Sequence, residues 1–447
     1  MSKRERQKGH PLRRINPQAA GIDVGSASHW VAIDPSLDER PVREFAAYTS
    51  DLVALADWLV QHAVTTVAME ATGVYWIALF EVLRDRGLEV CLVDARATKQ
   101  VAGRKSDVSD CQWIQELHSY GLLKQAFLPD AQIATLRSYV RQRDRWVADA
   151  GRAIQHMQQA LELMNVKLTE VVSEITGATG LAIIDSILAG ERDAERLSEH
   201  RHPRCSRGRE EIARALQGSW REEHLFALEQ ARDHYRYLGE RIVACDARID
   251  AVMRACASSP GSDPQPPTPG KRDSSPHPFR FDAHGHCYRL AGVDLTAIAG
   301  VGVNTVLTVL AETGVDMSAW RSERAFGSWL GLAPNLRKSG GRILRSATRP
   351  NAQRAATALR LAARSLSRSK SALGAFYRRL RARIGAPKAI TATAYKIAKL
   401  FYRMLKTKSP YQDLGQAAYD ERFRLRRLRS LNRMAAELGF RLVTAGE

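Results

Sequence analysis

The stretch GIDVGSASHWVAIDP, residues 21–35, decides the fold. Two short apolar runs with β-branched side chains lie on either side of a turn that contains glycine, a pattern that predicts two adjacent antiparallel strands. The segment PVREFAAYT at residues 41–49 predicts a third strand of the same kind. A meander of three antiparallel strands therefore opens the chain.

Helical and strand patterns alternate after this meander, up to about Leu128. Three antiparallel strands followed by β-α-β elements indicate an α/β domain of the ribonuclease H-like type over residues 19–128. The expected elements are helices at 51–63, 75–87 and 107–121 and strands at 65–70 and 88–94.

Four acidic residues lie near the ends of these elements. Asp23 in GIDVG and Glu70 in VAMEATG each close an apolar run, so both should lie at strand ends. Asp107 and Asp110 in KSDVSD are three residues apart at the start of a helix, which places both on one helix face. Four converging carboxylates repel one another unless cations lie between them. Oxygen-only ligands with open positions suit a pair of Mg²⁺ ions, which support in-line attack on a phosphodiester.

Each acid taken alone also has a structural explanation. An Asp after a strand is often a turn residue and an Asp before a helix is often an N-cap, while Ser106 or Ser109 could cap the same helix. The ordered set of acids favours the metal site over these explanations. Tyr75 and Trp76, which follow VAMEATG closely, are expected to pack in the core, with stacking on a nucleobase as the alternative.

Positive charge is segregated at one end of the chain. The formal net charge of the 447 residues is +19. Residues 321–447 contain 29 Lys and Arg against 6 Asp and Glu, so the remainder carries a slight negative excess. Such one-sided charge indicates a polyanion partner, and nucleic acid is the expected one. Residues 1–18, with 6 basic groups and 1 acidic group, are predicted to form a disordered basic arm.

The middle of the chain, residues 129–256, shows a different periodicity. Two series of apolar residues advance by steps of three and four, which predicts two long coiled-coil helices. Arg143 is the polar interruption of the first series. The pair is a hairpin packed on itself or a dimerisation arm, and the two interpretations are compatible. The first series is Ile133, Leu136, Val140, Val147, Ala150, Ile154, Met157, Leu161, Met164 and Leu168, and the second is Leu228, Ala231, Tyr235, Leu238, Ile242, Cys245, Ile249, Val252 and Cys256.

The segment 257–291 begins with a run rich in Pro, Ser and Gly, at 257–280, and is predicted to be a flexible linker or an insertion. Its HGHC motif offers His284, His286 and Cys287 as metal ligands, but without a second cluster of ligands a structural role is favoured. The six cysteines form no CxxC pair and are expected to be reduced thiols of a cytosolic protein. No apolar stretch has the length of a membrane span, and no apolar run follows the basic N-terminus as in a signal peptide.

Residues 292–410 carry three further patterns. GVG at 300–302, between two apolar helical runs, is similar to a helix-hairpin-helix turn whose backbone amides can meet a phosphate, although a Gly turn often merely joins two helices. The first half of residues 326–363 predicts a Gly-rich loop that carries Ser339-Gly340-Gly341, and the second half predicts a basic helix. A further helix is expected at about 388–405, and the tail, residues 411–447, is strongly cationic.

Together these motifs resemble those of a known family. GIDVG, MEATG and KSDVSD are similar to the catalytic acid motifs of the DEDD transposases of insertion sequence family 110, relatives of the pilin-gene invertases. GVG, WLGLAP and the SGG loop are similar to the C-terminal domain of that family. The resemblance covers about residues 19–125 and 292–385, with the coiled coil between them. It implies a RuvC-like catalytic domain, a long coiled-coil hairpin and a mainly helical, basic C-terminal transposase domain.

The resemblance also implies the chemistry. The four acids would hold two Mg²⁺ ions, and Ser339 would be the nucleophile, with Ser346 as the alternative. A structured guide RNA encoded by the element would pair with both donor and target DNA. Because the acids and the serine belong to different domains, the site is expected to be assembled across a domain or subunit contact. The basic residues expected to meet nucleic acid are Arg337, Lys338, Arg342, Arg345, Arg349, Arg424, Arg426 and Arg427.

The expected activity is cutting and rejoining of DNA by a transposase, which acts as a homodimer or tetramer in the nucleoid of a prokaryotic cytoplasm. One rival is an actin-like or sugar-kinase ATPase, because GIDVGSAS resembles the first phosphate loop of that superfamily. No second Asp-Gly phosphate motif and no Gly-rich adenosine loop is evident, and a basic C-terminal region has no role there. The other rival, a non-catalytic nucleic-acid scaffold, is disfavoured because all four acids are present.

Overall fold

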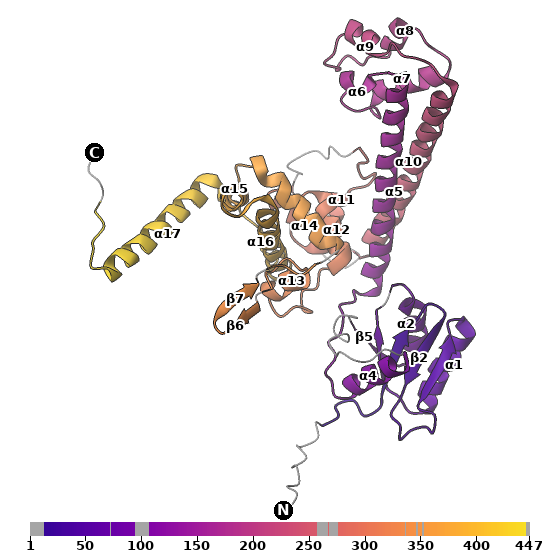
Figure 1. Ribbon diagram of the computed structural model, residues 1–447, viewed down its shortest axis with the longest axis vertical. Coiled ribbons are helices and arrows are strands. Elements are labelled where there is room, and N and C mark those ends of the chain that lie inside the picture. Colours follow the sequence, from indigo (N-terminus) through magenta and orange to yellow (C-terminus); the bar gives the residue numbers. More distant parts are fainter. Residues whose placement is uncertain are drawn as a thin grey trace, which may run out of the picture. The chain divides into compact units, whose positions relative to one another are not determined.

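The chain folds into two compact units, Met1–Leu128 and Pro129–Glu447. In Figure 1 the first is coloured indigo to purple and the second purple to yellow. The structure, a computed structural model, describes residues 13–71, 73–93, 107–256, 267, 276–335, 337–345, 347–350 and 353–443. Within these ranges it describes the backbone but not the side chain of Asp107, Arg337, Lys338, Ile343 and Arg345.

The first unit is built around a mixed five-stranded sheet with the strand order β3-β2-β1-β4-β5. β2 pairs antiparallel with both β1 and β3, whereas β1, β4 and β5 run parallel. This is a meander extended by β-α-β units, as the sequence predicts, and it is consistent with a ribonuclease H-like topology. The strands are β1 (Ala19–Val24), β2 (Ser28–Ala32), β3 (Val42–Ala46), β4 (Thr66–Glu70) and β5 (Glu89–Val93).

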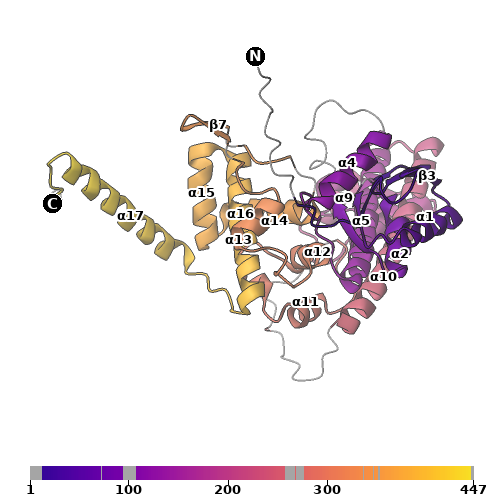
Figure 2. The same cartoon turned by 90° about the horizontal axis from the view of Figure 1, so that it is seen from below.

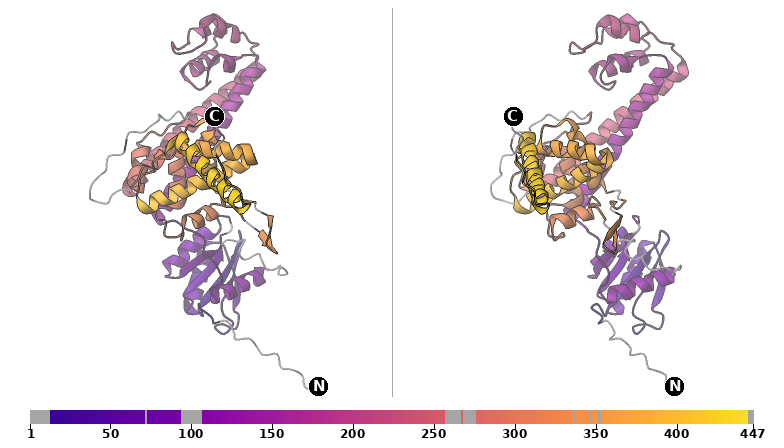
Figure 3. Two further views of the ribbon diagram at one scale, coloured as in Figure 1. Left: turned by 90° about the vertical axis from the view of Figure 1, so that its left-hand side faces the viewer. Right: turned by 60° about the vertical axis from the view of Figure 1, so that its left-hand side comes forward.

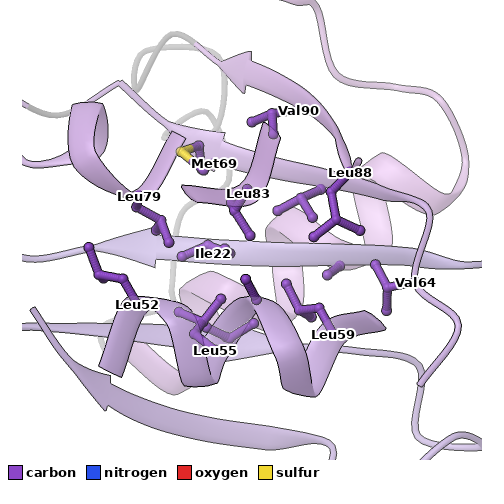
Figure 4. Packing of buried hydrophobic residues seen from close by; sticks show 14 of the residues in the cluster. Ile22, Leu52, Leu55, Leu59, Val64, Met69, Leu79, Leu83, Leu88 and Val90 are labelled. Atoms are coloured by element: carbon purple, nitrogen blue, oxygen red, sulfur yellow. The ribbon is translucent and has the colours of Figure 1, made fainter. Parts of the chain in front are cut away.

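Helices cover both faces of this sheet. α1 (Thr49–Gln61) and α2 (Trp76–Asp85) pack on one face, and α4 (Asp107–Ser119) packs on the other. The main apolar cluster of the unit lies on the α1/α2 side, where Figure 4 shows Ile22 and Met69 among the leucines of the two helices. The sheet is therefore held from both sides by apolar contacts.

The end of the predicted basic arm packs on this unit. The backbone N–H groups of Ile15 and Asn16 both donate to the carbonyl oxygen of Ser119, at 2.8 and 2.9 Å. A segment so rich in charge is expected to stay solvated, but these backbone hydrogen bonds hold it. The prediction of a disordered arm is therefore wrong for residues 13–18, whereas residues 1–12 lie outside the described residues.

Two long helices, α5 (Ala131–Leu163) and α10 (Glu222–Cys256), lie side by side in the second unit (Figures 1 and 3). Apolar residues of both predicted series are buried along them. The first predicted series is longer than the helix that it predicts. α5 ends at Leu163, and Leu168 is the first residue of the next helix. Asn165, with a φ of +56°, turns the chain between the two.

The far end of this hairpin carries a small helical tip that the sequence analysis does not anticipate. Four short helices fold over the ends of α5 and α10 (Figure 3). They enclose an apolar core that includes Ile183, Leu197 and Ile212. The tip helices are α6 (Leu168–Val171), α7 (Ala178–Leu188), α8 (Ala194–Ser198) and α9 (Arg209–Ala215).

The polar interruption of the first series, Arg143, forms a buried ion pair between the two long helices. Its Nε lies 2.5 Å from Oδ1 of Asp246 in α10, and the two residues are only 4% and 1% exposed. Arg143 also donates to the carbonyl oxygen of His277 at 2.9 Å, and its guanidinium lies 4.1 Å from the ring centroid of Phe279. One buried pair therefore joins α5, α10 and the segment that follows them.

Replacing Arg143 by Met is expected to lower the free energy of unfolding by about 3–5 kcal/mol, because the Asp246 carboxylate is left buried without a counter-charge. The double variant R143M/D246L should recover most of this loss, since apolar side chains can fill the same space. Chemical denaturation followed by circular dichroism compares both with the unmodified chain. Equal stability of the single variant and the unmodified chain would contradict the assigned role of the pair.

The rest of the second unit is mainly a bundle of helices (Figure 2). It is joined to α5 by two hydrogen bonds from Arg141 to the carboxylate of Glu312, at 2.8 and 2.7 Å, and by one from Arg354 to Asp144 at 3.1 Å. The elements are α11 (Ala283–Ala291), η1 (Leu295–Ala297), α12 (Val303–Thr313), α13 (Glu323–Trp329), α14 (Arg354–Ser365), η2 (Leu366–Arg368), α15 (Ala372–Ile384), α16 (Ala386–Thr407) and α17 (Gly415–Glu437).

Two predictions for this unit are corrected. The linker prediction is wrong for residues 276–291, because α11 lies there and its buried side chains pack on the bundle, whereas 257–266 and 268–275 lie outside the described residues. The GVG turn is preceded only by the single 3₁₀ turn η1, so the expected pair of helices is not formed. Gly300 is required there by packing, since a Cβ atom would lie 2.7 Å from the carbonyl oxygen of Ala362.

All six cysteines are free thiols, as the lack of CxxC pairs predicts. Among the described helices, none combines the length and the apolar character that crossing a bilayer requires.

Candidate active site

Asp23 and Glu70 lie on one face of the sheet, at the ends of neighbouring strands. β1 and β4 run parallel with Ile22 opposite Met69, so the two acids are the next residues along. Ile22 and Met69 point into the core on the α1/α2 side. Because successive strand residues alternate between faces, Asp23 and Glu70 point to the side that α4 covers. Glu70 is only 9% exposed there, and Asp23 is half-buried.

The helix α4 lies directly against β1. A Cβ atom on Gly21 would lie only 2.2 Å from the backbone nitrogen of Gln115 and 2.4 Å from the carbonyl oxygen of Cys111. Any other residue at this position would therefore push the helix away. Glycine here brings the helix that carries Asp110 close to the strand that carries Asp23.

The thiol of Cys111 links Asp23 and Asp110. Burial raises the pKa of Cys111 to about 12, and the negative charges of both carboxylates add to the rise. Both carboxylates therefore lie within electrostatic range of this thiol.

Asp107 opens α4, and its backbone lies one turn before Asp110 on the same helix face, but its side chain lies outside the described residues. Among the side chains that are described, no group of three or more His, Cys, Asp or Glu is arranged to hold a metal ion. The chemistry of the donor set does fit Mg²⁺, because Asp23, Glu70 and Asp110 offer carboxylate oxygens alone. The metal site thus stays a prediction.

Ser339 ends the first strand of an exposed β-hairpin. β6 (Arg337–Ser339) and β7 (Arg342–Arg345) pair antiparallel, with Ser339 directly opposite Arg342, and both of these residues are exposed. Gly340 and Gly341 form the two-residue turn with φ values of +53° and +77°, which glycine adopts most easily. The prediction of a Gly-rich loop is therefore wrong, because strand pairing extends up to the turn.

Positive charge gathers around this hairpin. The backbone register places Arg337 opposite Arg345. Arg342 in the hairpin and Arg349 after it are exposed. Ser346, the alternative nucleophile, and the side chains of Arg337, Lys338 and Arg345 lie outside the described residues.

The three tail arginines named from the sequence lie on the exposed helix α17 in different surroundings. Arg424 donates to the carboxylate of Glu421 at 3.0 Å, and the Cζ atom of Arg427 lies 6.0 Å from the ring centroid of Phe423. Arg426 donates only to a backbone carbonyl of its own helix, at 3.3 Å. The three residues are therefore not equivalent as contacts for nucleic acid.

The sequence also singles out two aromatic residues after VAMEATG and two serines near the start of α4. Tyr75 is 49% exposed, so the prediction that it packs in the core is wrong, whereas Trp76 packs edge-to-face on Phe80 with ring centroids 5.6 Å apart. Tyr75 precedes the first residue of α2 and faces outward. Ser109 lies inside α4 and therefore does not cap it, and Ser106 lies outside the described residues.

The HGHC motif supplies separate structural contacts. Nε2 of His286 lies 2.8 Å from Oδ1 of Asp250, whereas Nε2 of His284 lies 3.3 Å from Oδ1 of Asp294. Burial raises the pKa of Cys287 to about 12, so this thiol stays protonated near neutral pH. The two histidines thus face different carboxylates.

The two regions that carry the acids and the serine each match known transposases. A family model described as a transposase, for the DEDD enzymes of IS110 elements, matches residues 20–166 and spans all four acids. A second model, described as the transposase IS116/IS110/IS902 family, matches residues 294–378 and spans Ser339. The two matches thus define an enzyme that cuts and joins DNA.

The chain belongs to the IS110 family of DEDD transposases. No curated protein matches it. The family matches remove the sugar-kinase and scaffold alternatives, because both matched regions are those of transposases.

Proposed function

We propose that this transposase transfers DNA strands through a covalent phosphoserine formed on Ser339, with Mg²⁺ held by Asp23, Glu70, Asp107 and Asp110. The observation that supports the proposal is the position of Asp23 and Glu70 at neighbouring strand ends, on the side of the sheet that is covered by α4, the helix that carries Asp110. In this proposal residues 19–128 form a RuvC-like catalytic domain.

The proposed step is an in-line displacement at phosphorus. Oγ of Ser339 attacks the scissile phosphodiester, the Oγ–P bond forms, the P–O3′ bond breaks, and the serine proton ends on the released 3′-oxygen. Arg342, directly opposite Ser339 in the hairpin, would neutralise the non-bridging oxygens as charge develops. Mg²⁺ would supply Lewis-acid polarisation of the phosphate.

The phosphoserine keeps the energy of the broken phosphodiester bond. A different 3′-hydroxyl can therefore attack the same phosphorus, release the serine and reseal the strand without ATP. This reversibility suits an enzyme that exchanges strands between donor and target DNA. A serine hydroxyl is a weak nucleophile at its ordinary pKa, so the reaction depends on activation at the site.

We further infer that the basic region from residue 292 onward holds DNA and a structured guide RNA. The segregated positive charge of residues 321–447 supports polyanion binding. The working form is proposed to be a homodimer or tetramer. Tyr237 and Val243 on α10 support this, because they are 50% and 46% exposed on a helix that is otherwise packed along one side.

The guide RNA is tested by purifying the protein from cells that carry the whole element and sequencing the nucleic acid that comes with it. We expect one structured RNA that maps to the non-coding DNA beside the gene. Recombination by an RNA-free preparation at the same rate would remove the guide from the proposal and leave the chemistry of Ser339 and the acids untouched.

A further inference from the structure

The helix α17 projects from the bundle, and none of its residues is buried (Figure 1). Its first half is anchored on α15. The rings of Tyr419 and Phe376 meet edge to face with centroids 6.4 Å apart, and Arg379 donates to Asp420 at 3.0 Å. From Arg424 to Met434 every side chain is exposed. Most of this helix is therefore open to a partner.

One side of α17 carries four arginines, here called the arginine stripe. They follow one another by steps of four, three and four residues, which at 3.6 residues per turn keeps them within an arc of about 60°. The stripe is about 16 Å long, at 1.5 Å of rise per residue. Its members, all exposed, are Arg422, Arg426, Arg429 and Arg433.

Among the described residues of α17, the carboxylates neutralise little of the positive charge of the stripe. Asp420 is turned to α15, and Glu421 pairs with Arg424 on another side of the helix. Glu437 lies 3.8 Å from Arg433, but both side chains are more than two-thirds exposed (76% and 67%), so the pair contributes about 1 kcal/mol at most. Like charges one turn apart destabilise a helix, which makes an external polyanion the expected partner.

We propose that the arginine stripe binds the phosphate backbone of B-form DNA without reading its sequence. The proposal rests on the transposase function for the presence of DNA. Duplex DNA carries one negative charge per roughly 1.7 Å of its axis, so a stripe of about 16 Å meets enough phosphates for all four arginines. An α-helix about 10–12 Å wide fits the major groove of B-DNA, which is about 12 Å wide, whereas the corresponding groove of A-form RNA is too narrow.

The same helix offers a matched control. Arg424 and Arg427 carry the same charge but lie about 130° or more from the middle of the stripe, and about 100° or more from each of its members, at 3.6 residues per turn. Arg424 is held by Glu421, and Arg427 lies against the ring of Phe423. The double variants R426Q/R429Q and R424Q/R427Q therefore remove equal charge from one helix, and only the first removes it from the stripe.

The test measures how the full-length protein binds a short fluorescent DNA duplex over a range of salt concentrations, without Mg²⁺. R426Q/R429Q should flatten the log–log salt slope by about 1.8 and weaken binding roughly 60-fold at 0.1 M salt, because two phosphate contacts are lost. R424Q/R427Q should leave the slope close to that of the unmodified chain, in which case Arg424 and Arg427, which the sequence also offers as nucleic-acid contacts, do not meet the duplex. Circular dichroism checks that both variants keep the helix.

Three results would overturn the proposal. Equal losses of affinity in the two double variants would mean that DNA binding depends on the total charge of α17 and not on the side of the helix that carries it. Unchanged binding in both would mean that α17 does not contact DNA. A larger loss for double-stranded RNA than for DNA with R426Q/R429Q would assign the stripe to RNA. Because uncleaved duplex is measured without Mg²⁺, the outcome does not depend on whether Ser339 and the acids are correctly assigned.

Discussion

Replacing Ser339 by alanine is expected to abolish strand transfer, with a loss of at least about 10⁴-fold in rate, because the atom that bonds to phosphorus is removed. The covalent protein–DNA adduct should disappear with it. The adduct is measured on denaturing gels after incubation with Mg²⁺ and DNA of the element ends. Mass spectrometry of the digested adduct from the unmodified chain should place the nucleotide on Ser339.

Serine 346 supplies the control for this experiment. Ser346→Ala should keep the adduct if Ser339, which faces Arg342 in the hairpin, is the nucleophile. An adduct mapped to Ser346 or to a tyrosine would move the nucleophile. Hydrolytic nicking that persists unchanged in the Ser339→Ala variant would show that water, not a serine, attacks the phosphodiester.

The second large effect is expected for Asp110→Asn, which removes one carboxylate charge and almost no volume. Cleavage should fall by about 10³-fold or more, as when a main electrostatic contribution to catalysis is lost. Mn²⁺ bound in place of Mg²⁺, measured by electron paramagnetic resonance, should be lost in parallel. Binding of uncleaved DNA should change little, because the net charge of residues 321–447 is untouched.

Asp85→Asn is the matched control for Asp110, since this exposed carboxylate ends α2 in the same unit. It should keep both cleavage and Mn²⁺ binding. If Asp110→Asn also recombined DNA at the normal rate with Mg²⁺ present, the acids would not form the metal site. A loss of cleavage with unchanged Mn²⁺ binding would give Asp110 a role other than that of a ligand.

The sheet of the first unit could be predicted because its strands have strong local patterns. The apolar runs before Asp23 and Glu70 mark two strand ends, and parallel neighbours bring such ends to the same edge. The close approach of α4 to Gly21 could not be predicted, because it depends on residues about 90 positions apart. For the same reason Arg143 is only an interruption in the sequence, until its partner Asp246 is known.

The hairpin of Ser339 was missed for a different reason. Arg, Lys and Ser have low strand propensity, which hides β6, yet Gly-Gly between two short runs is a known signal of a two-residue hairpin. The density of charge in the tail predicts only a polyanion partner. The spacing of its arginines at helical intervals separates the stripe that contains Arg429 and Arg433 from Arg424 and Arg427. The tip went unnoticed because its helices are too short for a periodic pattern.

The chain enters and leaves the tip of the long hairpin through two neighbouring helices. The chain reaches it through α5 and leaves it through α10, which lie side by side. The buried ion pair of Arg143 is about 30 Å away from the tip along α5, at 1.5 Å per residue. Replacing the tip by a short loop or by another small domain would therefore leave the ion pair between Arg143 and Asp246 in place. The hairpin thus connects the tip to the rest of the chain only through its two long helices, among the residues that the structure describes.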